Sequence, residues 1–228
     1  MIKNLYLTVF DPYKVGEGLK EKKSWVLVAL IVFILTLAFS LPYSYKGYQE
    51  AMSQLEIQKP ELVKKLKDAG RWESMINVSQ KAIMIRTSVG VLITYVFSIV
   101  VTGVLLLLGI RFVTPEGDYA TMIASWTHAT FINYSIASLV KGLIIWAKGS
   151  TLGVTTSLLI FFNASPLSKT GRALQAFDIF DIWAAIACGL IIAGALSIEK
   201  KKGVYVSLGV WLIKSILLAG LAMISPGM

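Results

Sequence analysis

The sequence is poor in the residues that catalysis and metal binding use most often. It holds one cysteine, Cys188, and one histidine, His128. A single cysteine forms no internal disulfide and no cysteine-based metal site, so we expect a small core residue there. One histidine without a serine in a nucleophile turn leaves little machinery for a protease, and we expect it to be packed or hydrogen-bonded. No P-loop, HExxH, GxSxG or GxGD motif is present. The sequence therefore predicts a protein that is not an enzyme and holds no cofactor and no metal.

Charge is also scarce. Only 15% of the 228 residues are charged and 56% are hydrophobic, whereas about a quarter of the residues of a soluble domain are charged. The net charge is nevertheless +9. Because no basic stripe alternates with aromatic residues, nucleic acid is not an expected partner. The excess of Lys and Arg is typical of a protein that holds cations on one side of a bilayer, and membrane lipids are the expected partner.

Several uncharged runs are long enough to cross a bilayer, which takes about 20 helical residues. We expect spans near residues 25–45, 84–112, 119–147, 177–198 and 204–225. An interfacial segment over residues 1–24 precedes them, and a polar loop over residues 46–83 separates the first two. Pro42 predicts the end of the first span. The expected fold is therefore an all-α integral membrane protein, a bundle of five transmembrane helices plus short interfacial helices in one membrane domain, residues 1–228.

One uncharged segment is ambiguous. Residues 149–168 are rich in Gly, Ser and Thr and could span, re-enter the membrane or lie on its surface. The basic stretches LKEKK and EKKK, before the first and last spans, favour the cytoplasm. They share a side only if an even number of spans lies between them, which excludes a span over 149–168. We therefore expect a multi-pass protein with a cytoplasmic N terminus and a C terminus outside, in the plasma membrane if the chain is prokaryotic.

Small residues recur at a spacing of four in the fourth expected span. They are Ala185, Gly189 and Ala193. Small residues at this spacing let two helix backbones approach closely. The pattern predicts a helix-packing face.

Charged residues inside or at the ends of the spans form a candidate polar cluster in the outer half of the bundle. Its members are Asp178, Asp181, Lys214, Lys141 and Arg86. The two aspartates are three residues apart and share one helix face. Lys214 lies about 15 Å into the last span, where a charge costs about 2.5–3.5 kcal/mol. It therefore needs water or a partner, and its long stem could reach Asp181.

The sequence leaves three interpretations of this cluster open. The charges could form ion pairs that lock helices together, form a site for a solute, a lipid headgroup or a proton, or lie at the interface with water. A divalent cation is disfavoured, because the pair Asp178 and Asp181 supplies too few ligands.

The entry to the fourth span also carries a motif. Asp178, Phe180 and Trp183 spell Asp-x-Phe-x-x-Trp. Three further features accompany the motif: the stretch VFDPYKVGEGLKEKKSW before the first span, EGDYA at the third span and a long first loop. With these features, the chain resembles the prokaryotic branch of the Yip family, five-span proteins named for interaction with Ypt/Rab GTPases. The Asp-Leu-Tyr-Gly-Pro signature and the Gly-Tyr motif of eukaryotic members are absent from matching places, so Rab-type GTPase binding is not carried over.

The resemblance implies a non-catalytic multi-pass protein linked to membrane organisation or trafficking. Such an adaptor or scaffold would work through helix packing and through contacts with other membrane proteins or with further copies of itself. The alternative is a small transporter or channel that uses the polar cluster. An intramembrane enzyme is the least supported class, because the sequence offers so little catalytic machinery.

Overall fold

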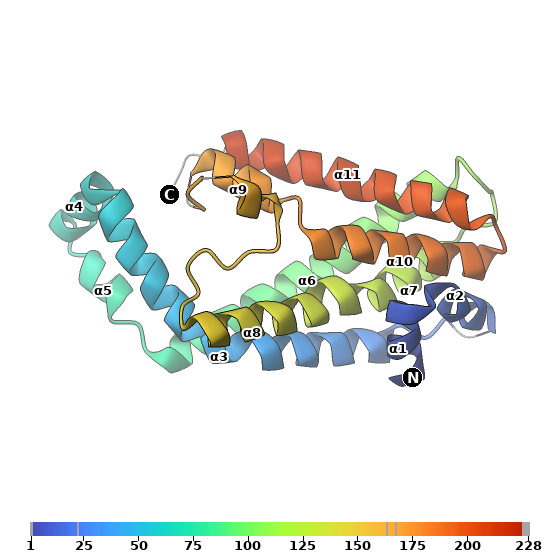
Figure 1. Ribbon diagram of the computed structural model, residues 1–228, viewed down its shortest axis with the longest axis horizontal. Coiled ribbons are helices and arrows are strands. Elements are labelled where there is room, and N and C mark those ends of the chain that lie inside the picture. Colours follow the sequence, from blue (N-terminus) through green and yellow to red (C-terminus); the bar gives the residue numbers. More distant parts are fainter. Residues whose placement is uncertain (1, 22, 163, 167, 225–228) are drawn as a thin grey trace.

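The computed structural model describes every residue except 1, 22, 163, 167 and 225–228, and 82% of it is helical. Within these residues the only β pairing is one antiparallel bridge between Ser157 and Asp178. The helices lie roughly along one long axis (Figure 1).

Five helical segments are long and apolar enough to cross a membrane. They are α3 (Val26–Gln58), α6 (Gln80–Ile110), the segment Tyr119–Lys148, α10 (Ile179–Leu196) and α11 (Lys200–Ile224). The third consists of α7 (Tyr119–Thr130), a π-helical turn η1 (Phe131–Ile136) and α8 (Ala137–Lys148). In Figure 1, α3, α6 and α7–α8 lie side by side, with α10 and α11 above them. These findings confirm the predicted all-α membrane fold with five spanning helices.

The first long helix does not end at Pro42, so that prediction is wrong. α3 passes through Pro42 and continues to Gln58. Proline removes one backbone hydrogen bond from a helix interior. Pro42 therefore leaves the Ala38 carbonyl without its helical donor, and membrane helices tolerate such a site. Nearby, Ser40 donates to the Thr36 carbonyl at 2.7 Å and Ser44 donates to the Leu41 carbonyl at 2.8 Å.

Beyond the bundle, the chain folds into a helical arm, which we define as residues 46–79. It contains the end of α3, α4 (Pro60–Asp68) and α5 (Trp72–Ile76), and it projects past the other helices in Figure 1. Val63 and Trp72 are buried in it. Lys67 forms an ion pair with Glu56 at 2.8 Å and lies 5.8 Å from the Trp72 ring. The polar loop of the sequence is thus a packed helical unit.

Two short helices close the other end of the bundle. They are α1 (Ile2–Phe10) and α2 (Pro12–Glu21), and Val15 and Leu19 of α2 are buried in a small cluster with Ile191 of α10. Lys20 donates to Ser197 at 2.7 Å, and the Lys200 ammonium lies 4.6 Å from the Tyr13 ring. The two basic stretches therefore meet at the same end of the molecule.

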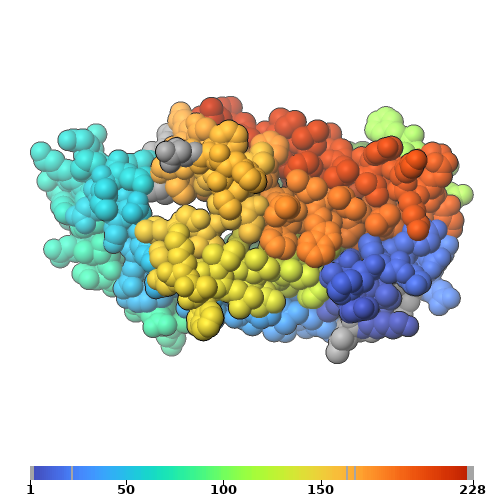
Figure 2. Space-filling model, viewed as in Figure 1, coloured from blue at the N-terminus to red at the C-terminus, as the bar shows by residue number. Residues whose placement is uncertain are grey.

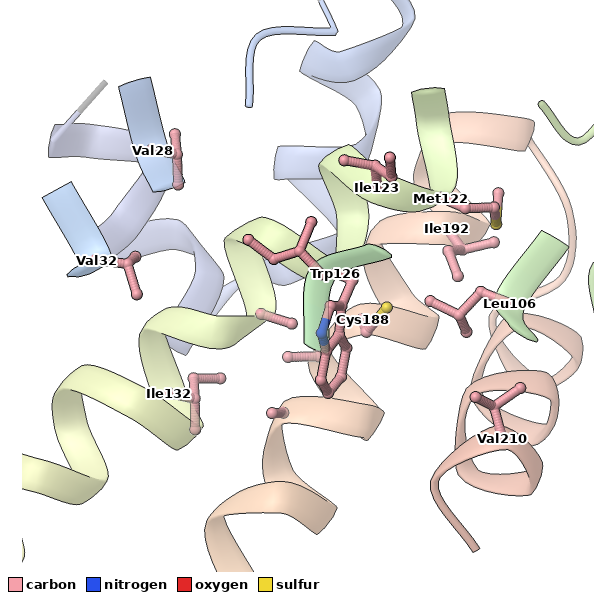
Figure 3. Close-up of a cluster of buried hydrophobic side chains, with 14 of the residues drawn as sticks. Val28, Val32, Leu106, Met122, Ile123, Trp126, Ile132, Cys188, Ile192 and Val210 are labelled. Atoms are coloured by element: carbon pink, nitrogen blue, oxygen red, sulfur yellow. The ribbon is translucent and has the colours of Figure 1, made fainter. Parts of the chain in front are cut away.

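The main core lies between α3, α6, α7, α10 and α11. Figure 3 shows Trp126 of α7 in its middle, with Cys188 of α10 beside the indole. Cys188 is fully buried, as its apolar run predicted. His128 is also fully buried, and its Nδ1 hydrogen-bonds with the Ala124 carbonyl at 2.9 Å. Both residues are thus packed within the fold.

Helix α10 is packed at backbone distance on two sides. Ala185, Gly189 and Ala193 are all buried. A Cβ atom added to Gly189 would lie 2.5 Å from Cα of Val204 in α11. On the other side, a Cβ atom on Gly16 of α2 would collide with the Ile191 carbonyl. The small residues of α10 therefore let both neighbours reach its backbone.

The close contact at Gly189 makes this position intolerant of any side chain. We expect Gly189→Ala to lower the free energy of unfolding by about 1–3 kcal/mol, because the backbones of α10 and α11 must move apart. The matched control is Gly209→Ala in α11, where an added Cβ atom meets nothing within 4 Å. Thermal unfolding of the purified variants in detergent measures both. Equal stability of the two variants would contradict the packing role.

A carboxylate fixes the start of the third span. Asp118 accepts hydrogen bonds from the Thr121 amide at 3.0 Å, the Thr121 hydroxyl at 2.7 Å and Lys23 at 2.7 Å. Partial burial by itself raises the pKa of Asp118, but the bonds from Lys23 and Thr121 outweigh it and hold the pKa at about 2.

This lowered pKa predicts acid sensitivity. A carboxyl group that binds protons more weakly in the folded state than in the unfolded one stabilises the fold above its unfolded pKa of 3.8. The contribution is lost as the pH falls from about 4 to about 2. We expect Asp118→Asn to flatten the loss of stability in this pH range, measured by thermal unfolding at a series of pH values. An unchanged pH profile would contradict the assignment.

Candidate functional site

A break between two helices precedes the fourth span, where the candidate aspartates lie. Helix α9 (Lys169–Gln175) ends just before α10 begins, and residues 176–178 separate them. Residues 156–158 run alongside this break. The Leu158 amide donates to the Phe177 carbonyl at 2.9 Å, and the Ile179 amide donates to the Thr156 carbonyl at 3.1 Å. The loop therefore satisfies backbone groups that the broken helix leaves unpaired.

The ambiguous segment thus takes a definite form. Its described residues form no spanning helix but a loop with one short 3₁₀ turn, η2 (Leu158–Phe161). In Figure 1 this loop runs from the end of α8 to α9, which lies beside the second half of α11.

Asp178 connects three parts of the fold. Its Oδ1 accepts from the Phe180 amide at 2.9 Å, which caps the N terminus of α10. Its Oδ2 accepts from the Thr156 hydroxyl at 2.6 Å and from the Lys141 ammonium at 3.1 Å. The Asp178 side chain is 14% exposed and that of Lys141 36%. A carboxylate at a helix N terminus is stabilised by the cap and by the helix dipole. Through its three hydrogen bonds, Asp178 joins α8, the loop and α10.

Asp181 has a different partner. Its Oδ1 accepts from the Asn133 amide group at 2.7 Å. Asn133 belongs to the π-helical turn η1, where the ordinary helical hydrogen bonds are shifted by one residue. The Oδ1 atom of Asn133 is buried, and no hydrogen-bond partner is found for it in the described structure. The π turn therefore delivers an amide donor to the second aspartate.

Lys214 does not form the direct ion pair with Asp181 that the sequence suggested. Among the described ion pairs none joins these residues. The Lys214 ammonium lies 4.9 Å from the Trp126 ring centroid, while Asp181 attracts it through space. A desolvated cation over an indole face gains about 2 kcal/mol. Asp181 accepts from Asn133 instead, and the Trp126 indole is the contact that Lys214 makes.

Arg86 does not join the cluster, so this part of the prediction is wrong. It is exposed on the second turn of α6. Arg86 precedes the buried Tyr95 by nine residues, which is two and a half turns of a helix, so the two side chains point to opposite faces. The sequence placed Arg86 at the right end of its span but could not fix its direction.

The two aromatic residues of the motif link the core to the surface of α10. Phe180 is partly buried and packs against the main core, whereas Trp183 is 38% exposed, and their rings stack with centroids 6.2 Å apart. In the motif, Asp178 therefore caps the helix, Phe180 packs on the core and Trp183 stacks on Phe180 at the surface.

Three partners of the cluster escaped the sequence analysis: Asn133, Thr156 and Trp126. All are uncharged, and each becomes a partner only because a π turn, a loop or a helix crossing brings it near. The polarity of the third span was the one signal that could have pointed to Asn133. No group of three or more His, Cys, Asp or Glu side chains lies together in the described ranges.

The Lys141–Asp178 pair predicts measurable energetic coupling. In a double-mutant cycle with Lys141→Met and Asp178→Asn, we expect a coupling energy of about 0.5–1.5 kcal/mol, because the pair is partly shielded from water. The control cycle uses Lys202→Met and Glu199→Gln, an exposed pair one helical turn apart in sequence, and should give about 0.5 kcal/mol or less. Thermal unfolding in detergent measures both cycles. A coupling no larger than that of the control would contradict the structural role.

Comparison with known proteins supports the resemblance seen in the sequence. The family model of the Yip1 domain matches residues 6–222, nearly the whole chain. No curated protein and no solved structure matches the chain. With its five apolar spans and this extended match, the chain belongs to the Yip1 domain family and is a multi-pass integral membrane protein.

Proposed function

We propose that the chain is a non-enzymatic adaptor or scaffold that organises the membrane by holding other membrane proteins. The observation that carries this proposal is the internal pairing of the half-buried charges. Asp178 binds Lys141, Asp181 accepts from Asn133, and Lys214 lies over an indole. Charges held in this way lock helices to one another, which favours a structural role over a translocation path.

The surfaces left for contacts are the apolar outer faces of the spans and the helical arm. Lipids, other membrane proteins or further copies of the chain are the partners that suit the apolar faces. The arm exposes Ile57 and Ile76, of which Ile57 is 72% exposed. A partner protein bound at the arm would cover these two side chains.

We further propose that the N terminus is cytoplasmic and the C terminus lies outside, in the plasma membrane if the chain is prokaryotic. The support is the cation distribution, because Lys20 and Lys23 lie at the same end of the bundle as Lys200–Lys202. Clusters of Lys next to spans favour the cytoplasmic side. An odd number of spans then leaves the C terminus on the other side.

Site-specific photocrosslinking in native membranes tests the adaptor proposal. A photoreactive residue at position 57 should give one defined adduct with a membrane protein. The control places the probe at position 112, where Phe112 is 93% exposed in the short connection between α6 and α7. Equal, diffuse labelling from both positions would contradict a docking arm.

A small transporter or channel is the second candidate. One observation favours it: the third span contains a π turn whose Asn133 contacts Asp181, and π turns inside helices often occur at functional sites. Flux of ions and small solutes into proteoliposomes separates the two candidates. The adaptor proposal expects none. Flux that Asp181→Asn or Lys214→Met abolishes would replace the adaptor with the transporter.

A further inference from the structure

A cleft of about 510 Å³ opens beside the break between α9 and α10. It lies between the part of α3 that belongs to the arm, the loop that follows α8 and the segment that leads into α10. Figure 2 shows the surface hollowed where the cyan end of α3 meets the gold and orange segments. This volume suits a small molecule or a lipid headgroup.

Polar side chains line much of this cleft. They include the hydroxyl groups of Thr151, Thr155 and Ser157, the amides of Gln54, Gln58 and Gln175, and one charged pair, Lys141 and Asp178. The Thr151 hydroxyl already donates to Glu50, and the hydroxyls of Thr155 and Ser157 bond to each other at 2.7 Å. The glutamine amide groups are therefore the neutral side chains best able to donate to a ligand.

The Lys141–Asp178 pair leaves more hydrogen-bond donors than acceptors for a ligand in the cleft. Asp178 already accepts from Phe180, Thr156 and Lys141. The Lys141 ammonium carries three N–H groups and uses one of them on Asp178. Two strong donors therefore remain for a ligand, whereas the carboxylate has little accepting capacity left. Such a site favours an anion.

The charged residues around the cleft also favour an anion. Lys46 donates to the Gly149 carbonyl, and Lys148 donates to the Leu152 carbonyl at 2.6 Å. Both groups are cations that bind only neutral oxygen atoms there. The one further acid nearby, Glu50, accepts from the amide and the hydroxyl of Thr151. The Glu50 carboxylate is thus hydrogen-bonded to the loop.

Apolar surface adjoins the polar cleft. Lys141 and Thr151 also border a second hollow of about 270 Å³, which Phe39, Tyr43 and Ile145 line together with several polar residues. Phe161 of η2 is 79% exposed in the loop that borders the cleft. An anion attached to an acyl chain would find a donor-rich cleft and apolar surface at one place.

We propose that this cleft binds a phosphate group, with Lys141 as its charged donor and the amide groups of Gln54 and Gln175 as further donors. The phosphate belongs either to an anionic lipid headgroup or to a free small molecule, and the adjoining apolar surface favours the lipid. The cleft shares Gln54 and Gln58 with the arm, and the site adds a ligand to a protein for which the adaptor role requires none.

Titration of the purified chain in detergent tests the site. The probes are dihexanoyl phosphatidylglycerol and inorganic phosphate, and isothermal calorimetry gives Kd. The key variant is Gln175→Glu, which places a negative charge in the lining at an exposed residue at the end of α9. We expect it to raise Kd at least tenfold. The matched control is Gln80→Glu, an exposed glutamine at the start of α6 that does not line the cleft.

Lys141→Gln should weaken binding similarly, with Arg86→Gln as its control. Because Lys141→Gln also removes an ion pair, Gln175→Glu keeps the test valid if the first variant folds poorly. Binding of the lipid alone supports a headgroup site, and binding of inorganic phosphate with the same variant pattern supports a site for a free phosphate. Binding of neither probe, or an unchanged Kd in Gln175→Glu, overturns the proposal. Crosslinking from position 57 is a separate readout, so failure of this site leaves the adaptor proposal intact.

Discussion

The architecture depends on one requirement of the membrane: every backbone N–H and C=O group at membrane depth needs a hydrogen-bond partner. A broken helix violates this requirement unless another part of the chain supplies partners. Residues 156–158 do so by pairing with residues 177–179, and Asp178 holds the arrangement from the side chain. The loop, α8 and α10 are thereby joined at a single residue, and the break between α9 and α10 becomes a stable feature of the fold.

Close packing carries the rest of the bundle. Helix α10 spans only 18 residues, yet it contacts α2 and α11 at backbone distance through Gly16, Gly189 and Gly203. In lipid, burial of apolar side chains gives little drive for helices to associate, so close van der Waals contact takes over this role. The half-buried charges add directional contacts to it, because each pairs with a specific side chain on another helix or on the loop.

Composition and periodicity were enough to predict the fold class and the five spanning helices, because long uncharged runs and their lengths determine these features. The family followed from the resemblance around the Asp-x-Phe-x-x-Trp motif. Details that depend on tertiary contacts were not predictable. Pro42 lies inside α3, and the partner of Lys214 is an aromatic ring that no charge rule selects. The candidate cluster was found through its charged members, whereas Asn133 and Thr156 are neutral and far away in sequence. Arg86 shows the opposite error, since its place along the span was right and its direction around the helix was not.

The length of α3 has a mechanical consequence. Its 33 residues make a rod of about 50 Å, while the hydrocarbon core of a bilayer is about 30 Å thick. One end of the rod is embedded in the core through Val28 and Val32, and the other carries α4. A force applied to α4 by a bound partner would therefore bend α3, and the bend would concentrate at Pro42, where a helix kinks most easily. Movement of the arm would in this way reach the part of α3 that packs in the core.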